Sequence, residues 1–108
     1  MDEQTWNKTI RLPGDFPARL ERFIRDPSSR AADVFFEETF DIGDRTTLTV
    51  TVKHDLYQGV VLHLTLLADD GSRYLGGTEA EIAEATDLPG QYEVRRGSRR
   101  YRVRLAFS

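Results

Sequence analysis

The chain has 108 residues and a formal net charge of −3, and 31% of its residues are charged. A chain of this length is typical of a single domain, here residues 1–108, and is long enough to build one hydrophobic core. Its 39% hydrophobic content and its regular patterning exclude a disordered chain. It contains no cysteine, which excludes disulfides, a thiolate nucleophile and thiolate metal ligands.

The N-terminal sequence MDEQTWNKTI has neither the basic region nor the apolar region of a secretory signal peptide. No apolar run approaches the roughly 20 residues that a transmembrane helix needs. We therefore expect a cytoplasmic protein with no membrane partner, and the lack of cysteine agrees with a reducing compartment.

Two elements are expected before residue 33. Residues 1–12 are predicted to be an extended segment, in which Lys8 interrupts a row formed by Trp6, Ile10 and Leu12. A helical spacing follows at Phe16, Leu20, Phe23 and Ile24. Asp15 is suited to cap the N-terminus of this helix, and Pro27 disfavours its continuation. The spacing predicts one short amphipathic helix over residues 16–25.

From residue 33 to residue 108 most apolar residues recur at every second position, which is the period of a half-buried strand. The alternating rows are Val34, Phe36, Phe40 and Ile42; Leu48, Val50 and Val52; Leu62, Leu64 and Leu66; Tyr92 and Val94; and Tyr101, Val103, Leu105 and Phe107. The expected turns are Gly43-Asp44, Asp70-Gly71, Gly76-Gly77, Pro89-Gly90 and Gly97-Ser98. The segment TEAEIAEATD, residues 78–87, is ambiguous between helix and strand. These patterns predict a β-rich α+β fold, with the N-terminal helix packed on an antiparallel sheet or a β-sandwich.

One short stretch adds to this fold prediction. The segment LPGQYEV, residues 88–94, resembles the turn-then-tyrosine strand of bacterial immunoglobulin-like sandwich domains. The resemblance covers seven residues and implies a sandwich, and it carries over no functional residue.

The most basic segment is VRRGSRRYRVRL, residues 94–105, which holds six arginines within ten positions. Gly97-Ser98 lies between two alternating runs and predicts a two-residue hairpin turn with glycine first. The register that follows pairs Arg96 with Arg99, Arg95 with Arg100, Val94 with Tyr101, Glu93 with Arg102, Tyr92 with Val103, and Gln91 with Arg104. The apolar pairs then share one face. Arg95, Arg100, Arg102 and Arg104 share the other face, and Arg96 and Arg99 lie at the tip.

Two of these pairs place like charges opposite each other, which is destabilising unless another charge compensates. Residues 33–93 hold thirteen acids and three bases, a charge of −10, whereas residues 94–108 carry +6. Two sources of compensation are open. Either the arginines pair with an acidic strand of the same chain, such as FFEETFD at residues 35–41, or the compensating charge belongs to a partner.

If a partner supplies the charge, an acidic protein surface is favoured, because arginine and tyrosine are enriched at protein interfaces. Nucleic acid is the alternative, since arginine binds phosphate and the Tyr101 ring can stack on a base. The pI of about 5.3 lies below the range of typical nucleic-acid binders. The predicted partner-binding residues are Arg95, Arg96, Arg99, Arg100, Tyr101 and Arg102.

The sequence contains no nucleophile elbow, P-loop or dinucleotide-binding motif, so we assign no catalytic, cofactor-binding or metal-binding residue. His54 and His63 are expected on opposite faces of a hairpin formed by residues 47–54 and 60–67, where they cannot share a metal. Glu37 and Glu38 are likewise expected on opposite faces of one strand. The acidic segments 41–44 and 69–71 are expected to be ordinary turns.

The expected function is a non-catalytic protein-interaction module, such as a small inhibitor, immunity or adaptor protein, that docks through a bipolar charged surface. The alternatives are nucleic-acid binding through the arginine-rich hairpin, and an acidic inhibitor that mimics nucleic acid. A homodimer formed through a strand face or edge is a further option, because Val61 and Leu67 fall on the same face as His63.

Overall fold

The computed structural model describes residues 4–25, 33–43, 45–55, 59–68 and 73–108. The elements found there are β1 (Gln4–Leu12), α1 (Phe16–Arg25), β2 (Asp33–Gly43), β3 (Thr46–Asp55), β4 (Gly59–Ala68), β5 (Tyr74–Ile82), the 3-10 helix η1 (Ala85–Asp87), β6 (Gly90–Arg96) and β7 (Arg99–Phe107). Helix α1 has the bounds predicted from its apolar spacing. The ambiguous segment 78–87 divides between the end of β5 and η1.

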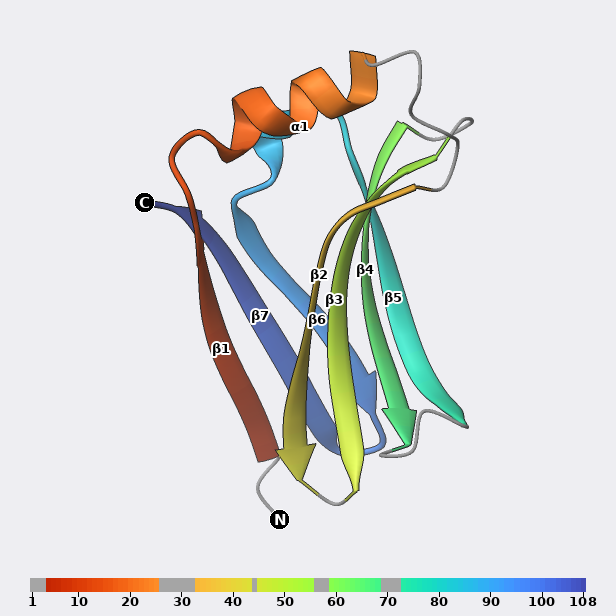
Figure 1. Cartoon of the computed structure of the whole chain (residues 1–108). Helices are drawn as coiled ribbons and strands as arrows, with labels where there is room; N and C mark the ends of the chain where they lie inside the picture. The colour runs from red at the N-terminus through yellow and green to blue at the C-terminus, as the bar shows by residue number, and fades with distance from the viewer. Residues whose placement is uncertain (1–3, 26–32, 44, 56–58, 69–72) are drawn as a thin grey trace.

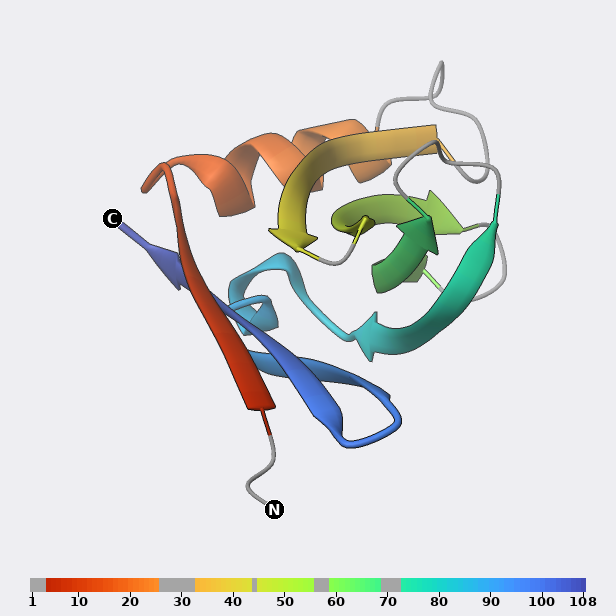
Figure 2. The same ribbon diagram turned by 90° about the horizontal axis from the view of Figure 1, so that it is seen from below.

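The strands form two sheets that face each other as a sandwich (Figures 1 and 2). One sheet has the order β2-β3-β4-β5 and is an antiparallel meander, and the other has the order β1-β7-β6. The predicted β-rich α+β fold is confirmed. Strands β1 and β7 are neighbours that run toward the same end of the sandwich, and they pair in parallel. The likeness to immunoglobulin-like domains does not extend to the strand connections, since their sheets are connected as Greek keys and the β2-β3-β4-β5 sheet here is a meander.

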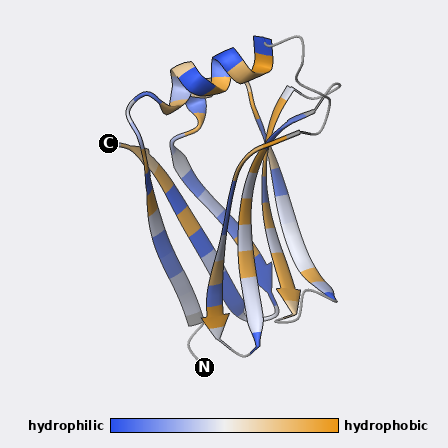
Figure 3. Cartoon of the chain, in the orientation of Figure 1, coloured by the Kyte–Doolittle hydropathy of each residue, from blue (hydrophilic) through white to orange (hydrophobic). Residues whose placement is uncertain are grey.

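The hydrophobic core lies between the two sheets. Figure 3 shows apolar and polar residues alternating along the strands, as strands with one buried face require. The fully buried side chains from the two sheets include Leu48, Val50, Val52, Leu62, Leu64, Leu66, Val103 and Leu105. The rows predicted from period-two spacing supply most of this core. Val34 is the exception, because an irregularity between Val34 and Phe36 puts it opposite the outward-facing Lys53, and it is 52% exposed.

Helix α1 closes one end of the sandwich (Figure 1). Its Phe16 ring makes edge contacts with Phe35 and Phe36 of β2, at centroid distances of 5.2 and 5.8 Å. The same ring lies 6.3 Å from the ring of Phe107 at the end of β7. Phe16 therefore connects the two sheets at this end. Neither helix in the described part of the chain is long and apolar enough to cross a membrane.

A tyrosine anchors the start of β6. The Tyr92 hydroxyl donates a 2.6 Å hydrogen bond to the carbonyl oxygen of Leu88, and the Leu88 side chain is fully buried. A tyrosine that bonds back to the backbone a few residues upstream is the corner found in immunoglobulin sandwiches. Burial raises the pKa of the Tyr92 phenol above its usual value of 10.0, and the nearby Asp87 carboxylate adds to this increase. The corner fixes where the chain enters the β1-β7-β6 sheet.

The expected turn at Gly76-Gly77 is wrong, because both glycines lie inside β5. A side chain at position 77 would be crowded by its neighbours. A Cβ atom at this position would lie 2.7 Å from the Tyr74 hydroxyl oxygen and 3.0 Å from the Leu64 carbonyl oxygen. The expected turn at Gly97-Ser98 is confirmed, and Gly97 has the positive φ of 62° that a glycine-first turn requires. The expected turn at 70–71 lies outside the described residues, as does Asp44.

Candidate binding surface

The β6–β7 hairpin has the register predicted from its turn, with Arg95 opposite Arg100 and Arg96 opposite Arg99. Because side chains alternate across a strand, this register sends the arginines to two sides of the sheet. Arg95, Arg100 and Arg102 point outward, away from the second sheet. Arg96 and Arg99 point to the inner side, beyond the last buried pair of the hairpin. The predicted binding residues therefore do not form one surface.

The outward side chains of the β1-β7-β6 sheet form a cationic surface, which we call the arginine face. Its charged members are Arg11 from β1, Glu93 and Arg95 from β6, and Arg100, Arg102 and Arg104 from β7. The arginine face therefore carries five arginines and one glutamate, and its net formal charge is +4. The neutral members Thr5, Asn7, Thr9 and Gln91 are all exposed. No described element covers this face (Figure 2).

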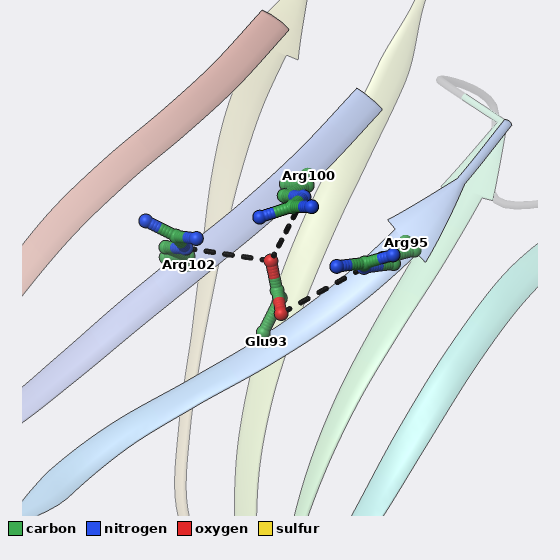
Figure 4. A network of polar contacts seen from close by, with 4 residues as sticks. All are labelled: Glu93, Arg95, Arg100 and Arg102. Carbon is green, nitrogen blue, oxygen red and sulfur yellow. Dashed lines mark hydrogen bonds and ion pairs between the residues drawn. The ribbon is translucent and has the colours of Figure 1, made fainter. Parts of the chain in front are cut away.

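One carboxylate connects three arginines of the arginine face (Figure 4). A Glu93 carboxylate oxygen lies 3.3 Å from the Nε of Arg102, which donates a hydrogen bond to it, and 3.8 Å from the Nε of Arg100. The other oxygen of Glu93 lies 3.9 Å from the Nε of Arg95. Glu93 thus compensates the like-charged pair Arg95–Arg100. Within the described part of the chain, no ion pair reaches Arg11 or Arg104.

The hypothesis that an acidic strand lies beside the arginines is wrong for FFEETFD. Residues 35–41 belong to β2, which pairs with β3 in the other sheet, whereas β7 lies between β1 and β6. The outer face of this second sheet is acidic, with four carboxylates and one lysine among the side chains that the structure describes. These residues are Glu37, Asp41, Glu79, Glu81 and Lys53. The two charge blocks seen in the sequence therefore lie on opposite outer faces of the sandwich.

Tyr101 does not belong to the arginine face. Its side chain points into the core, opposite Val94, and is only 6% exposed. Its ring cannot stack on a base in this structure. Arg11 is a member that the sequence did not reveal, because only the parallel pairing of β1 with β7 brings it to this face. Arg104 was visible in the hairpin register but was not among the predicted binding residues.

Arg96 and Arg99 line a pocket at the end of the sandwich opposite α1. The pocket has a volume of about 440 Å³, and its other lining residues are Thr46, Gly97, Ser98 and Tyr101. Thr46 begins β3, so the pocket lies where the hairpin turn of one sheet meets the start of a strand of the other.

The histidines lie as their strand pattern predicted. His63 points outward and its Nε2 is 3.4 Å from a Glu79 carboxylate oxygen, whereas His54 lies on the core-facing row of β3. Glu37 and Glu38 also occupy opposite faces. The Asp41 carboxylate accepts a 3.0 Å hydrogen bond from the Gly43 amide, which is ordinary turn chemistry. In the regions the structure describes, no three His, Asp or Glu side chains gather as a metal site would require. The acidic segment 69–71 lies outside those regions.

Comparison of this chain with protein-family models, with curated proteins and with solved structures finds no match.

Proposed function

We propose that this protein is a non-catalytic interaction module that binds an acidic protein surface on its arginine face. The observation that supports the proposal is the net charge of +4 on an open sheet face whose only described acid, Glu93, is already shared by three arginines. A surface of this kind attracts a complementary acidic patch and orients it during encounter. The module belongs with small inhibitor, immunity and adaptor proteins, which act by docking.

The layout of the face specifies the pattern of charge that its partner carries. Glu93 lies on the edge strand β6 beside Arg95, and the peripheral arginines Arg11 and Arg104 lie on β1 and β7, outside its ion pairs. A complementary surface has carboxylates opposite the peripheral arginines and a basic or hydrogen-bond-donating side chain opposite Glu93. Arginine favours such an interface because its planar guanidinium binds a carboxylate through two parallel hydrogen bonds.

A protein partner is favoured over nucleic acid by the same geometry. Stacking on single-stranded bases needs exposed aromatic rings, and Tyr101, Tyr92 and Trp6 all lie on the inner side of the sheet. A duplex offers a continuous row of phosphates, which the Glu93 carboxylate repels. The acidic outer face of the second sheet is a weaker candidate for mimicking nucleic acid, because threonines separate its carboxylates and Lys53 lies among them.

The test measures the binding of a fluorescein-labelled poly-glutamate peptide of about 20 residues and a labelled duplex DNA of about 20 base pairs. Fluorescence anisotropy is recorded at about 50 and 150 mM salt, because screening weakens exposed charge contacts. The variant Arg95→Gln/Arg104→Gln removes two positive charges from the arginine face. The control Arg22→Gln/Arg25→Gln removes the same charge from exposed positions on α1.

We expect the peptide to bind the wild type and the α1 control with similar affinity, and the face variant about tenfold more weakly. Equal loss in both variants would show that only the overall charge matters and would contradict the proposal. Tighter binding of DNA than of the peptide, lost in the face variant, would reassign the arginine face to phosphate.

A further inference from the structure

The two outer faces of the sandwich carry opposite charges. The arginine face, on the β1-β7-β6 sheet, has a net formal charge of +4. The outer face of the β2-β3-β4-β5 sheet, which we call the acidic face, has a net formal charge of −3 among its described side chains, Glu37, Asp41, Glu79, Glu81 and Lys53. Each face lies on the side of its sheet away from the shared core (Figure 2). One molecule therefore presents two complementary charged surfaces that point in opposite directions.

The acidic face has the pattern of charge that suits a partner of the arginine face. Its carboxylates lie on the edge strands β2 and β5. Between them, β3 and β4 carry threonine hydroxyls and Lys53, which are hydrogen-bond donors. A partner surface needs a donor opposite Glu93 and carboxylates opposite the arginines beyond its ion pairs. Lys53 and the carboxylates of the edge strands provide both.

The spacing of the charges also agrees between the two faces. Glu37 lies opposite Thr51, so it is one strand and two residues away from Lys53. Arg104 lies on β7, next to β6, and is likewise one strand and two residues away from Glu93. Strand geometry makes both separations about 8 Å. The Lys53–Glu93 and Glu37–Arg104 pairs can therefore form in one contact between two molecules.

The groups in this match can accept a second partner. Within the part of the chain that the structure describes, no ion pair reaches Arg104, Lys53 or Glu81. Glu37 accepts one hydrogen bond, from the Thr51 hydroxyl at 3.4 Å, and a carboxylate can accept several more. The side chains of Arg104, Glu37 and Glu81 are exposed.

We propose that the arginine face binds the acidic face of a second copy of this chain, so that copies stack face to back. This rests on the proposed function, because it names the acidic surface that the arginine face takes. Two arginine faces repel each other, as do two acidic faces, so charge favours only the contact between unlike faces. Each bound copy leaves one face of each kind open, so the contact extends into an open stack instead of closing into a dimer.

Two variants, each with one weakened face, test this arrangement. Arg95→Gln/Arg104→Gln removes two charges from the arginine face, and Glu37→Gln/Glu81→Gln removes two from the acidic face. All four positions are exposed, so the fold should be retained. Sedimentation velocity measures association at about 0.05–1 mM protein and at about 20 and 300 mM salt, because salt screens exposed charges.

We expect the apparent mass of the wild type to rise beyond that of a dimer at low salt and to fall to that of a monomer at high salt. Each variant alone should associate at least about tenfold more weakly. Their equimolar mixture should form a dimer and nothing larger, because the intact acidic face of one variant binds the intact arginine face of the other. Net charge cannot cause this pairing, since the −3 of the chain becomes −5 in one variant and −1 in the other.

Matched controls change the net charge by the same amounts outside both faces. Arg22→Gln/Arg25→Gln and Glu21→Gln/Glu84→Gln alter exposed positions and should associate as the wild type does. A wild type that stays monomeric at low salt, or a mixture that associates no better than either variant alone, would overturn the proposal. Binding of poly-glutamate to the arginine face in that case would leave the proposed function standing with a different partner, and loss of both would overturn the proposed function as well.

Discussion

Glu93 lies directly opposite Arg102 in the β6–β7 hairpin, with a carboxylate oxygen 3.3 Å from the arginine Nε. The same carboxylate also contacts Arg95 and Arg100. One acid therefore holds together three cations that would otherwise repel one another, and this arrangement leads to the first prediction.

Glu93→Gln should lower the free energy of unfolding by about 1 kcal/mol, a value reduced for solvent screening because the side chains of the cluster are partly exposed. The loss should be larger at low salt, where the repulsion among the arginines is less screened. Urea unfolding at two salt concentrations measures both effects. Glu81→Gln, an exposed acid on the other sheet, is the control. A salt-independent loss would show that Glu93 acts through its short-range hydrogen bond to Arg102 and not by offsetting the repulsion among the arginines.

Tyr92→Phe should destabilise the protein by about 1–2 kcal/mol, because it leaves the Leu88 carbonyl without the 2.6 Å hydrogen bond from the phenol. Chemical unfolding of the purified variant measures the change. Tyr74→Phe is the control, since the Tyr74 side chain is 67% exposed and its loss of a hydroxyl should have little effect. Similar losses in the two variants would argue against an anchoring role for the corner.

Alkaline pH should destabilise the wild type through Tyr92. Its pKa is raised in the folded state above the usual 10.0, by burial first and by Asp87 second, so the folded protein retains the phenol proton longer than the unfolded chain does. The stabilising effect is fully present below about pH 10 and is lost as the pH rises through the folded-state pKa. Unfolding free energies of wild type and Tyr92→Phe, measured from about pH 8 to 11, should converge as the pH increases. A constant difference would contradict this prediction.

Lys8→Val should promote self-association through the edge strand β1. Lys8 lies on the inner side of β1, where its ammonium group is 5.7 Å from the centre of the Phe40 ring. An inward-pointing charge on an edge strand opposes pairing with a second copy, and valine removes that protection. Light scattering over a range of protein concentrations should reveal the association. The control variant Lys53→Val, on the interior strand β3, should show no increase in association. Association of both variants alike would point to lost charge rather than to the β1 edge.

The sequence alone predicted the features that depend on residues close to one another along the chain. The helix at residues 16–25 and the strand rows follow from periodicity, because a helix and a strand bury every third to fourth and every second residue, respectively. The hairpin register at Gly97-Ser98 follows from the turn type, which pairs Glu93 with Arg102 without any other part of the chain. Gly76-Gly77 was wrongly predicted as a turn. The closeness of the Tyr74 side chain to Gly77 depends on how the chain folds and cannot be read from the composition of the segment.

Only the tertiary structure decided which surfaces these elements form. The parallel pairing of β1 with β7 joins residues almost a full chain length apart and brings Arg11 to the arginine face. The division into two sheets separates β2 from the arginines and places the acidic and basic blocks on opposite faces. The packing of the two sheets also leaves the pocket beside Arg96 and Arg99. Local propensity specifies strands and their faces, whereas the choice of neighbouring strand depends on long-range burial that no short segment encodes.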